Sequence, residues 1–330
     1  MTIAEIAKLA GVSKACVSRY LNHGYVSEEK KRKIQTVIDA TGYVPSRQAQ
    51  ILRTGKSRLV GVILPKINSE SIGGMVAGIS SALGDRGFGI LLANTENNVE
   101  KELRYLELFQ QGQVEGVIFL GTLLTPRHRQ ILQNYPVPVV VLSQQVDYLS
   151  CVYNNDHDAA REITRELLDS GRKHVGYIGV TNRDRAVGAA RRAGFLEALR
   201  ERGIEIADEH MIVTGFTLED GNAAAQQLFE RAPKVDAVFC ATDTLAVGAM
   251  QYIKGVGKRI PEDVAVIGCN NSVYCTICYP QLSSIDNSLH ETGRTAAQQM
   301  IRLLNHEPDV EKTVCLPCRL VLRDTTPPMV

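Results

Sequence analysis

The chain has 330 residues, of which 44% are hydrophobic and 22% are charged, a composition that is ordinary for a globular protein of two or three domains. No apolar run reaches the roughly 18 residues of a membrane-spanning helix, and the N-terminus lacks the pattern of a signal peptide. These observations argue against a membrane or secreted protein. We expect a cytoplasmic chain whose eight cysteines are mostly reduced.

The net charge of +1 conceals an uneven distribution along the chain. The first 58 residues carry eleven Lys and Arg against four acidic residues, whereas the remainder carries 26 basic and 32 acidic side chains. A basic segment on an acidic body is typical of a protein that contacts a polyanion at one end. Charge alone leaves open the alternative that the cluster at residues 28–33 is the solvated face of a helix.

The N-terminal residues predict two helices joined by a Gly-Val turn. Thr2 followed by Glu5 has the spacing of a capping box, so the first helix is expected from about Ile3, and Ser13 is a natural N-cap for the second. The expected core-facing residues are Ile6 and Leu9, then Val17, Tyr20 and Leu21. This layout is typical of a helix-turn-helix, whose second helix enters the DNA major groove.

A third helix is expected between Ser27, as its N-cap, and Gly42, which follows its end. Its inner stripe consists of Ile34, Val37 and Ile38. After an extended connector, Ser46 is placed to cap one more short helix that ends before Gly55. A helix this short is marginal in water, so we expect it to form only on DNA.

From Leu59 onward, apolar segments alternate with helical segments. The expected strands are residues 58–64, 89–95, 116–120, 137–143, 174–180, 237–243 and 264–270, and the expected helices are about 69–86, 100–111, 156–170, 185–203, 218–231 and 243–257. The alternation predicts doubly wound parallel sheets in two α/β lobes, with a break near residues 150–158. A small ligand would bind in the cleft between the lobes, beyond the carboxyl ends of the strands.

Two Cys-x2-Cys pairs, at 275–278 and 315–318, have a spacing that zinc sites use. The second pair lies in VCLPCRLVL, which reads as one strand, and an odd separation in a strand points the two thiols to opposite faces. We therefore expect small buried side chains here and no metal.

The chain resembles the lac repressor family of bacterial regulators over almost its whole length. The motifs that carry the resemblance are IAKLAGVSKACVSRYLN and YVSEEKKRKIQTVIDATGYVPSRQAQILR in the head, and LPKINSESIGGMVAGI, ARRAGFLEAL, ATDTLAVGAM and PQLSSI in the body. The resemblance implies an all-α helix-turn-helix head at 1–45, a hinge helix and linker at 46–58, and a two-lobed core at 59–330 that is like periplasmic binding proteins. Lobe 1 would comprise about 59–157 with 287–316, and lobe 2 about 158–286 with 317–330.

By resemblance, Lys14 and Ala15 are the main residues that read DNA sequence. Lys14 can donate to guanine N7 and O6, Ala15 offers apolar contact to a thymine methyl, and Arg19 can bind a guanine or a phosphate. The full expected DNA-binding set in the head is Thr2, Ser13, Lys14, Ala15, Cys16, Ser18, Arg19, Asn22, Tyr25 and Ser27. The alternative for each is a solvated helix face, and for Tyr25 simple packing.

In the hinge, Ala49 and Leu52 match the family's minor-groove positions. A small residue lets two hinge helices approach across a dimer axis, and a leucine can wedge between base steps and kink the duplex. The alternative is that Leu52 is an ordinary core leucine.

The resemblance also implies a set of effector contacts in the cleft: Ser69, Ser71, Ser143, Arg191, Phe216, Asp243, Asn270 and Asn287. Arg191 would fork onto hydroxyls or an anionic group, Asp243 would accept from sugar hydroxyls, and Phe216 would stack on a sugar ring. The alternatives are that Asp243 only caps the helix that follows it and that Phe216 belongs to the core.

Three departures from the family pattern bear on these expectations. Cys16 stands where Thr is usual, residues 69–72 read Ser-Glu-Ser-Ile in place of Asn-Pro-Phe-Phe, and Asn270 and Asn271 replace a common carboxylate. Losing a carboxylate beside Arg191 would suit an anionic effector such as a sugar phosphate.

These observations together predict a ligand-responsive transcriptional regulator, a repressor of sugar-utilisation genes that binds a pseudo-palindromic operator as a homodimer. The expected partners are operator DNA, a sugar or sugar phosphate and a second copy of the chain, with a protein co-effector left open and no cofactor. The alternatives are a sugar-binding protein of the same fold without a regulatory role, and an enzyme. The sequence has no P-loop, GxSxG or HExxH motif and no strand–GxGxxG–helix unit, which argues against the enzyme.

Overall fold

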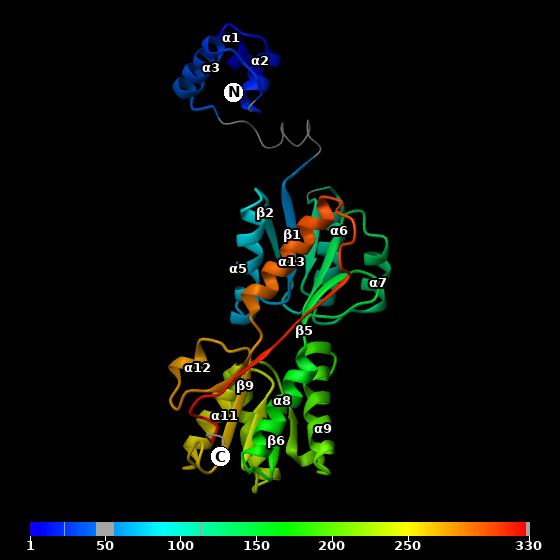
Figure 1. Cartoon of the computed structure of the whole chain (residues 1–330), viewed down its shortest axis with the longest axis vertical. Coiled ribbons are helices and arrows are strands. Elements are labelled where there is room, and N and C mark those ends of the chain that lie inside the picture. The colour runs from blue at the N-terminus through cyan, green and yellow to red at the C-terminus, as the bar shows by residue number, and fades with distance from the viewer. Residues whose placement is uncertain (23, 44–55, 113, 328–330) are drawn as a thin grey trace. The chain divides into compact units, whose positions relative to one another are not determined.

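The computed structural model describes residues 1–22, 24–43, 56–112 and 114–327 (Figure 1). The chain forms two compact units, Met1–Arg58 and Leu59–Val330. The described residues of the first unit form the helices α1 (Ile3–Leu9), α2 (Lys14–Leu21) and α3 (Glu28–Thr41). Its predicted capping box is present, since Thr2 and Glu5 bond reciprocally. Gly11, at φ 65°, makes the turn between α1 and α2 in a conformation that favours glycine.

The sequence pattern predicts the described helices of the head correctly, but two side chains differ from the prediction. Ile6, Val17 and Ile34 are fully buried and form the centre of its small core. Leu9 is 60% exposed, contrary to expectation, because α1 turns the face that carries Ile6 inward. Ser27 occupies the N-cap position of α3, but its side chain makes no capping hydrogen bond, so that prediction is wrong in its chemistry.

The second unit contains two six-stranded sheets, which belong to two lobes. The first sheet has the order β11-β5-β4-β3-β1-β2, and the second has the order β12-β10-β9-β8-β6-β7. The strands are β1 (Leu59–Leu64), β2 (Gly89–Asn94), β3 (Gly116–Phe119), β4 (Val139–Leu142), β5 (Ser150–Asn154), β6 (Val175–Gly179), β7 (Met211–Val213), β8 (Ala237–Cys240), β9 (Ala265–Cys269), β10 (Ser283–Asp286), β11 (Thr313–Leu316) and β12 (Arg319–Val321). All pairings are parallel except β10 with β12.

Helices cover both faces of each sheet, which explains why most of the strands are continuously apolar. In lobe 1, α5 and α13 pack on one face and α6 and α7 on the other; in lobe 2, α8 and α9 oppose α10 and α11. These helices are α5 (Glu70–Gly84), α6 (Val99–Gln110), α7 (Pro126–Gln133), α8 (Asp156–Asp169), α9 (Arg191–Glu201), α10 (Leu218–Arg231), α11 (Asp243–Gly255) and α13 (Leu289–Leu304). Shorter helical segments are η1 (Arg185–Ala190), η2 (Asp208–His210) and α12 (Tyr274–Ile277). The predicted all-α head and two α/β lobes are confirmed.

The chain passes between the two lobes at three points, after β5, after β10 and after β11 (Figure 1). The last crossing corrects the sequence interpretation, because residues 314–322 are not one strand: β11 belongs to the first sheet and β12 to the second. Pro317 lies at the break, where it cannot donate a ladder hydrogen bond. Cys315 and Cys318 therefore flank a crossing between lobes and do not lie on opposite faces of one strand.

Candidate functional site

The first candidate site is the outer face of α2. Ser13 caps this helix, accepting a hydrogen bond of 3.2 Å from the backbone N–H of Cys16. Lys14, Ala15 and Arg19 are exposed, while Val17 is fully buried on the opposite side and fixes the helix to the core. Neither Lys14 nor Arg19 has an ion-pair partner among the described residues. The helix therefore offers a rigid basic face to a partner.

The remaining head residues differ in how they are placed. Tyr25 is 89% exposed, so it does not pack into the head. Cys16 packs partly against the head's core, which leaves it less available to a partner than Lys14. Asn22 donates to the carbonyl of Ser18, a contact that stabilises the end of α2.

Other parts of the basic segment are less available or undescribed. On α3, Lys31 pairs with Glu28 and Lys33 with Glu29, as expected of a solvated helix face. Thr2 is committed to the capping box, and Ser27 is exposed at the start of α3. The predicted hinge residues Ala49 and Leu52 lie outside the described residues.

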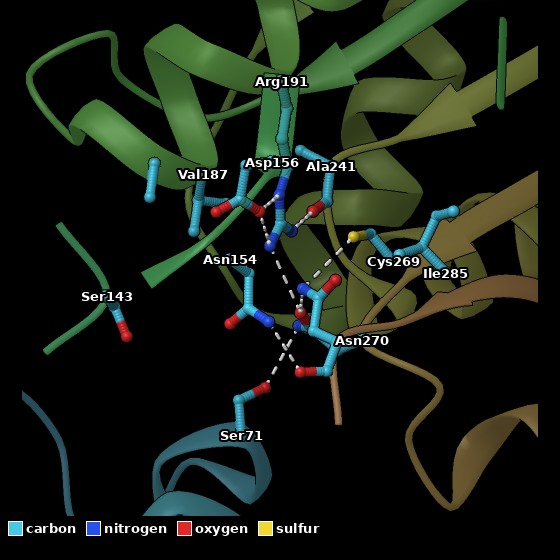
Figure 2. A network of polar contacts seen from close by, with 12 residues as sticks. Ser71, Ser143, Asn154, Asp156, Val187, Arg191, Ala241, Cys269, Asn270 and Ile285 are labelled. Carbon is cyan, nitrogen blue, oxygen red and sulfur yellow. Dashed lines mark hydrogen bonds and ion pairs between the residues drawn. The ribbon is translucent and has the colours of Figure 1, made fainter. Parts of the chain in front are cut away.

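The second candidate site lies between the two lobes and is organised around Arg191 (Figure 2). The guanidinium donates from Nε to Asp156 Oδ1 at 2.8 Å, and its Nη2 lies 2.7 Å from the same oxygen. Its Nη1 donates to the carbonyl of Ala241, and its Nη2 to Oδ1 of Asn270 at 3.3 Å. Arg191 is only 3% exposed. Asp156 balances its charge, so the amide of Asn270 in place of a carboxylate does not leave Arg191 without a carboxylate partner.

Asn270 joins this network to the other lobe. Its Nδ2 donates to Oγ of Ser71 at 3.1 Å, and its Oδ1 also accepts from Nδ2 of Asn287 at 3.1 Å. Asn287 in turn accepts at its backbone carbonyl from Asn154 at 2.9 Å. Asn270 has φ 118°, a region that residues other than glycine rarely occupy. The amide of Asn270 therefore links Arg191 of lobe 2 to α5 of lobe 1, because its oxygen accepts from Arg191 while its nitrogen donates to Ser71.

Asp243 is buried and already bonded. Its Oδ2 accepts from the backbone N–H of Ser272 at 2.7 Å, and its Oδ1 accepts from Oγ of Ser284 at 2.6 Å. The cap of α11 is Thr242, whose side chain accepts from the N–H of Leu245, so Asp243 is not the capping residue. Asp243 holds the loop that follows β9 beside the network.

Phe216 and Ser143 lie apart from this network. Phe216 packs partly against the lobe 2 core, and the Nζ of Lys66 lies 5.2 Å from its ring centroid, a cation–π contact between lobes. Oγ of Ser143 donates to Sδ of Met75 at 3.4 Å, and Figure 2 shows it standing apart from the bonded residues. Ser69 is the positional N-cap of α5 but makes no capping bond through its side chain.

Three charged residues of the site were not foreseen. Asp156 balances Arg191, Lys66 contacts Phe216, and Oε1 of Glu70 accepts from the backbone N–H of Val273 at 2.6 Å across the cleft. Asp156 begins α8 immediately after β5, so the general rule that ligands bind beyond strand ends was the signal that could have found it. The contacts of Lys66 and Glu70 depend on how the lobes meet, which no local pattern encodes.

An open groove of ≈ 790 Å³ adjoins the network on the side of α5 and α13. Its lining includes Glu70, Ser71 and Asn270, together with Asp286, His290 and Glu291. Within the described residues no cluster of His, Cys, Asp or Glu could hold a metal ion. No described helix is long and apolar enough to cross a membrane.

Comparison with known proteins identifies what this arrangement is similar to. Residues 2–46 match the family described as bacterial regulatory proteins, lacI family, and residues 164–326 match the periplasmic binding protein-like domain. Catabolite control protein A of Priestia megaterium is 30% identical over 329 residues, which cover 99% of each chain. The sucrose operon repressor of Staphylococcus xylosus is 29% identical over 305 residues, 92% of this chain and 94% of that protein.

Among solved structures, the lac repressor dimer bound to operator and the anti-inducer ONPF superimposes with a TM-score of 0.92. The alignment covers 99% of each chain at 23% sequence identity, so this likeness speaks for the fold alone. It confirms the predicted combination of a helical head with a core like periplasmic binding proteins.

Proposed function

The chain belongs to the lacI family of bacterial regulatory proteins, and we propose that it is a transcriptional repressor. In this proposal, a small effector that binds in the cleft changes the affinity of the protein for operator DNA. The observation that carries the proposal is the joint presence of two separate sites. The exposed basic face of α2 is suited to a DNA groove, and the polar network around Arg191 connects the two lobes of the core.

DNA reading is assigned to the first turns of α2. Lys14 and Ala15 face outward from a capped helix, where side chains reach base edges, and Arg19 follows about one turn later on the same face. Tyr25 and Ser27 are exposed beyond the helix and suit phosphate contacts, which fix register without reading sequence. We keep Ala49 and Leu52 as proposed minor-groove contacts of the hinge at 46–58.

We propose that the chain forms a homodimer. Two heads related by a twofold axis would then bind a pseudo-palindromic operator. Lobe 2 carries exposed apolar side chains close together in sequence, at Val273, Ile277 and Tyr279, and Lys254 of α11 lies over the Tyr279 ring. Exposed apolar side chains that gather on one segment are typical of protein–protein contact. Sedimentation equilibrium of the full chain is expected to give twice the monomer mass.

We propose that the effector is a sugar or a derivative of one. The name of the sucrose operon repressor supports a sugar, as do the hydroxyl and amide groups of Ser71, Asn270 and Asn287 between the lobes. An effector that prefers one angle between the lobes changes the population of DNA-competent molecules only by its difference in affinity for the two states. The network is the physical link, because Asn270 contacts both Arg191 and Ser71.

The proposal is tested by selecting sequences from a random duplex pool with the full chain and measuring affinity for the winners against random DNA. We expect an inverted-repeat consensus, a specific affinity at least about 1,000-fold above nonspecific affinity, and a steep salt dependence. Screening sugars and sugar phosphates against the specific complex then identifies compounds that change its affinity. A uniform affinity for all duplexes at one salt concentration contradicts the proposal.

A further inference from the structure

A second cavity, of ≈ 620 Å³, opens between the lobes at the side of α7, whereas the groove described above lies at the side of α5 and α13. Its walls come mainly from lobe 1, from the segments after β3 and β4, while Arg185 at the start of η1 comes from lobe 2. The lining residues used below are Arg129, Asp147, Tyr148 and Arg185. The cavity therefore spans the cleft and touches both lobes.

Two guanidinium groups face this cavity from opposite lobes. The Arg129 guanidinium stacks over the Tyr148 ring, 4.9 Å from its centroid, and lies 3.5 Å from Oδ2 of Asp147. That carboxylate is 77% exposed, so water screens its pairing with Arg129. Arg185 is exposed and has no ion-pair partner among the described residues.

The neighbouring groups do not cancel this positive charge. Asp184 precedes Arg185, but its carboxylate accepts from the backbone N–H groups of Ala186 and Val187. Burial raises the pKa of Tyr148, and the guanidinium groups of Arg129 and Arg185 oppose that shift, so the phenol remains a hydrogen-bond donor at neutral pH. The cavity offers two cations and a hydroxyl against one exposed carboxylate.

We propose that this cavity binds the phosphoryl group of a small metabolite, with Arg129 of lobe 1 and Arg185 of lobe 2 as its two cationic contacts. Guanidinium groups present forked donors that match the oxygens of a phosphoryl group. Arg191 cannot take this role, because Asp156, Ala241 and Asn270 already engage its donors. A phosphoryl group held by both lobes stabilises their approach at the side of α7. The inference rests on the proposed effector control and deepens it, because it names the chemical class of the effector.

The test uses the full chain and inorganic phosphate as the first probe, compared with chloride at matched ionic strength. Binding is measured by calorimetry and by the shift in thermal unfolding temperature. Arg129→Gln and Arg185→Gln are each expected to weaken phosphate binding by about tenfold or more, because each removes one charge-assisted contact. Arg127→Gln is the matched control, since Arg127 lies on the same helix, is 61% exposed and pairs with Glu100 outside the cavity.

Equal phosphate affinity in all four proteins, or no phosphate binding by the parent chain, overturns the inference. Phosphate-free melting curves show whether each variant is folded, so a lost response cannot be mistaken for unfolding. A second arm compares sugar phosphates with the same sugars lacking the phosphate, and tighter binding of the free sugars also overturns it. Failure in either arm leaves specific DNA binding intact, and that property separately tests the proposed function.

Discussion

Arg19 and Arg191 show how differently this chain uses the same side chain. Arg19 stands exposed on α2 with no ion-pair partner among the described residues, whereas Arg191 is buried and bonded to a carboxylate, a carbonyl and an amide. An exposed arginine keeps its donors for a partner, while a saturated one fixes the elements around it. The head therefore presents free hydrogen-bond donors to a partner, whereas the cleft network bonds the two lobes to each other.

The sharpest way to break this comparison is to remove the buried charge. Arg191→Met leaves Asp156 buried without its cation, and we expect it to destabilise the chain by about 3–5 kcal/mol. Urea unfolding followed by circular dichroism measures the loss. The matched control is Arg165→Met, because Arg165 pairs with Glu201 between the same two helices, α8 and α9, but at the surface. There we expect a loss below about 1 kcal/mol.

A loss below about 1 kcal/mol for Arg191→Met would show that Asp156 finds other partners and that the network is not a structural link. The double variant Arg191→Met, Asp156→Leu provides a further check. It removes both charges and is expected to regain most of the lost stability, since no unpaired charge remains buried.

The reader side of the comparison is tested by Lys14→Ala. We expect specific operator affinity to fall by about 1–3 kcal/mol, with relaxed preference at one base pair per half-site and little change in stability. Fluorescence anisotropy with operator and random duplexes at one salt concentration measures both effects. Lys33→Ala is the control, because Lys33 already pairs with Glu29 on α3. If Lys14→Ala lowers the affinity for operator and random duplexes equally, Lys14 contacts phosphate and does not read a base.

The two regions also differ in how much of them could be predicted from the sequence. The head follows local rules, since capping at Thr2 and Ser13 and helical periodicity predict the helices among its described residues. Its one misplaced core residue, Leu9, depends on a small rotation of α1 that packing decides. In the core, most buried strands and helices followed from alternation, but α7, α13, β5 and β10 were not predicted. The helix α7 is short and polar, and β5, β10 and α13 lie beside the points where the chain passes between the lobes.

The cleft was only partly predictable, because its bonds join residues far apart in the chain. Arg191 and Asn270 were expected there, yet the partner Asp156 lies 35 residues before Arg191 and meets it only after lobe 2 has folded. The contact of Asn270 with Ser71 spans 199 residues and two lobes. Residue identity indicated which groups belong to the cleft, and folding determined which of their donors are already used.

The link between lobes is tested more gently by Ser71→Ala. This change removes the acceptor of the Asn270 amide. We expect the free energy of interaction between the two lobes to weaken by about 0.5–1.5 kcal/mol, the net value of one hydrogen bond. Because the contact joins the two lobes that the proposed effector binds between, we expect effector affinity to change by a few fold and operator affinity without effector to change less. Calorimetry with the effector measures the change, and Ser69→Ala serves as control since its side chain makes no capping bond. Equal effector affinities of the two variants would show that the contact between Asn270 and Ser71 has no part in the response to the effector.

The smallest expected effect is a pH dependence of stability that arises from a buried carboxyl group in lobe 2. Burial raises the pKa of Asp184 above its ordinary value of 3.8, while hydrogen bonds from the backbone and the charge of Arg191 oppose the shift. The folded chain therefore holds this proton more tightly than the unfolded chain. The protonated carboxyl of Asp184 adds to the free energy of unfolding at low pH, and this contribution is lost as the pH rises through the folded pKa.

Asp184→Asn keeps an acceptor for the N–H groups of Ala186 and Val187 but cannot titrate. We expect its stability relative to the parent chain, measured by urea unfolding, to increase as the pH rises above the ordinary pKa of an aspartate, about 4, and then to level off. A relative stability that is flat or falls over that range would mean that the buried carboxyl is held ionised by its neighbours, in which case the cleft carries one more fixed negative charge beside Arg191.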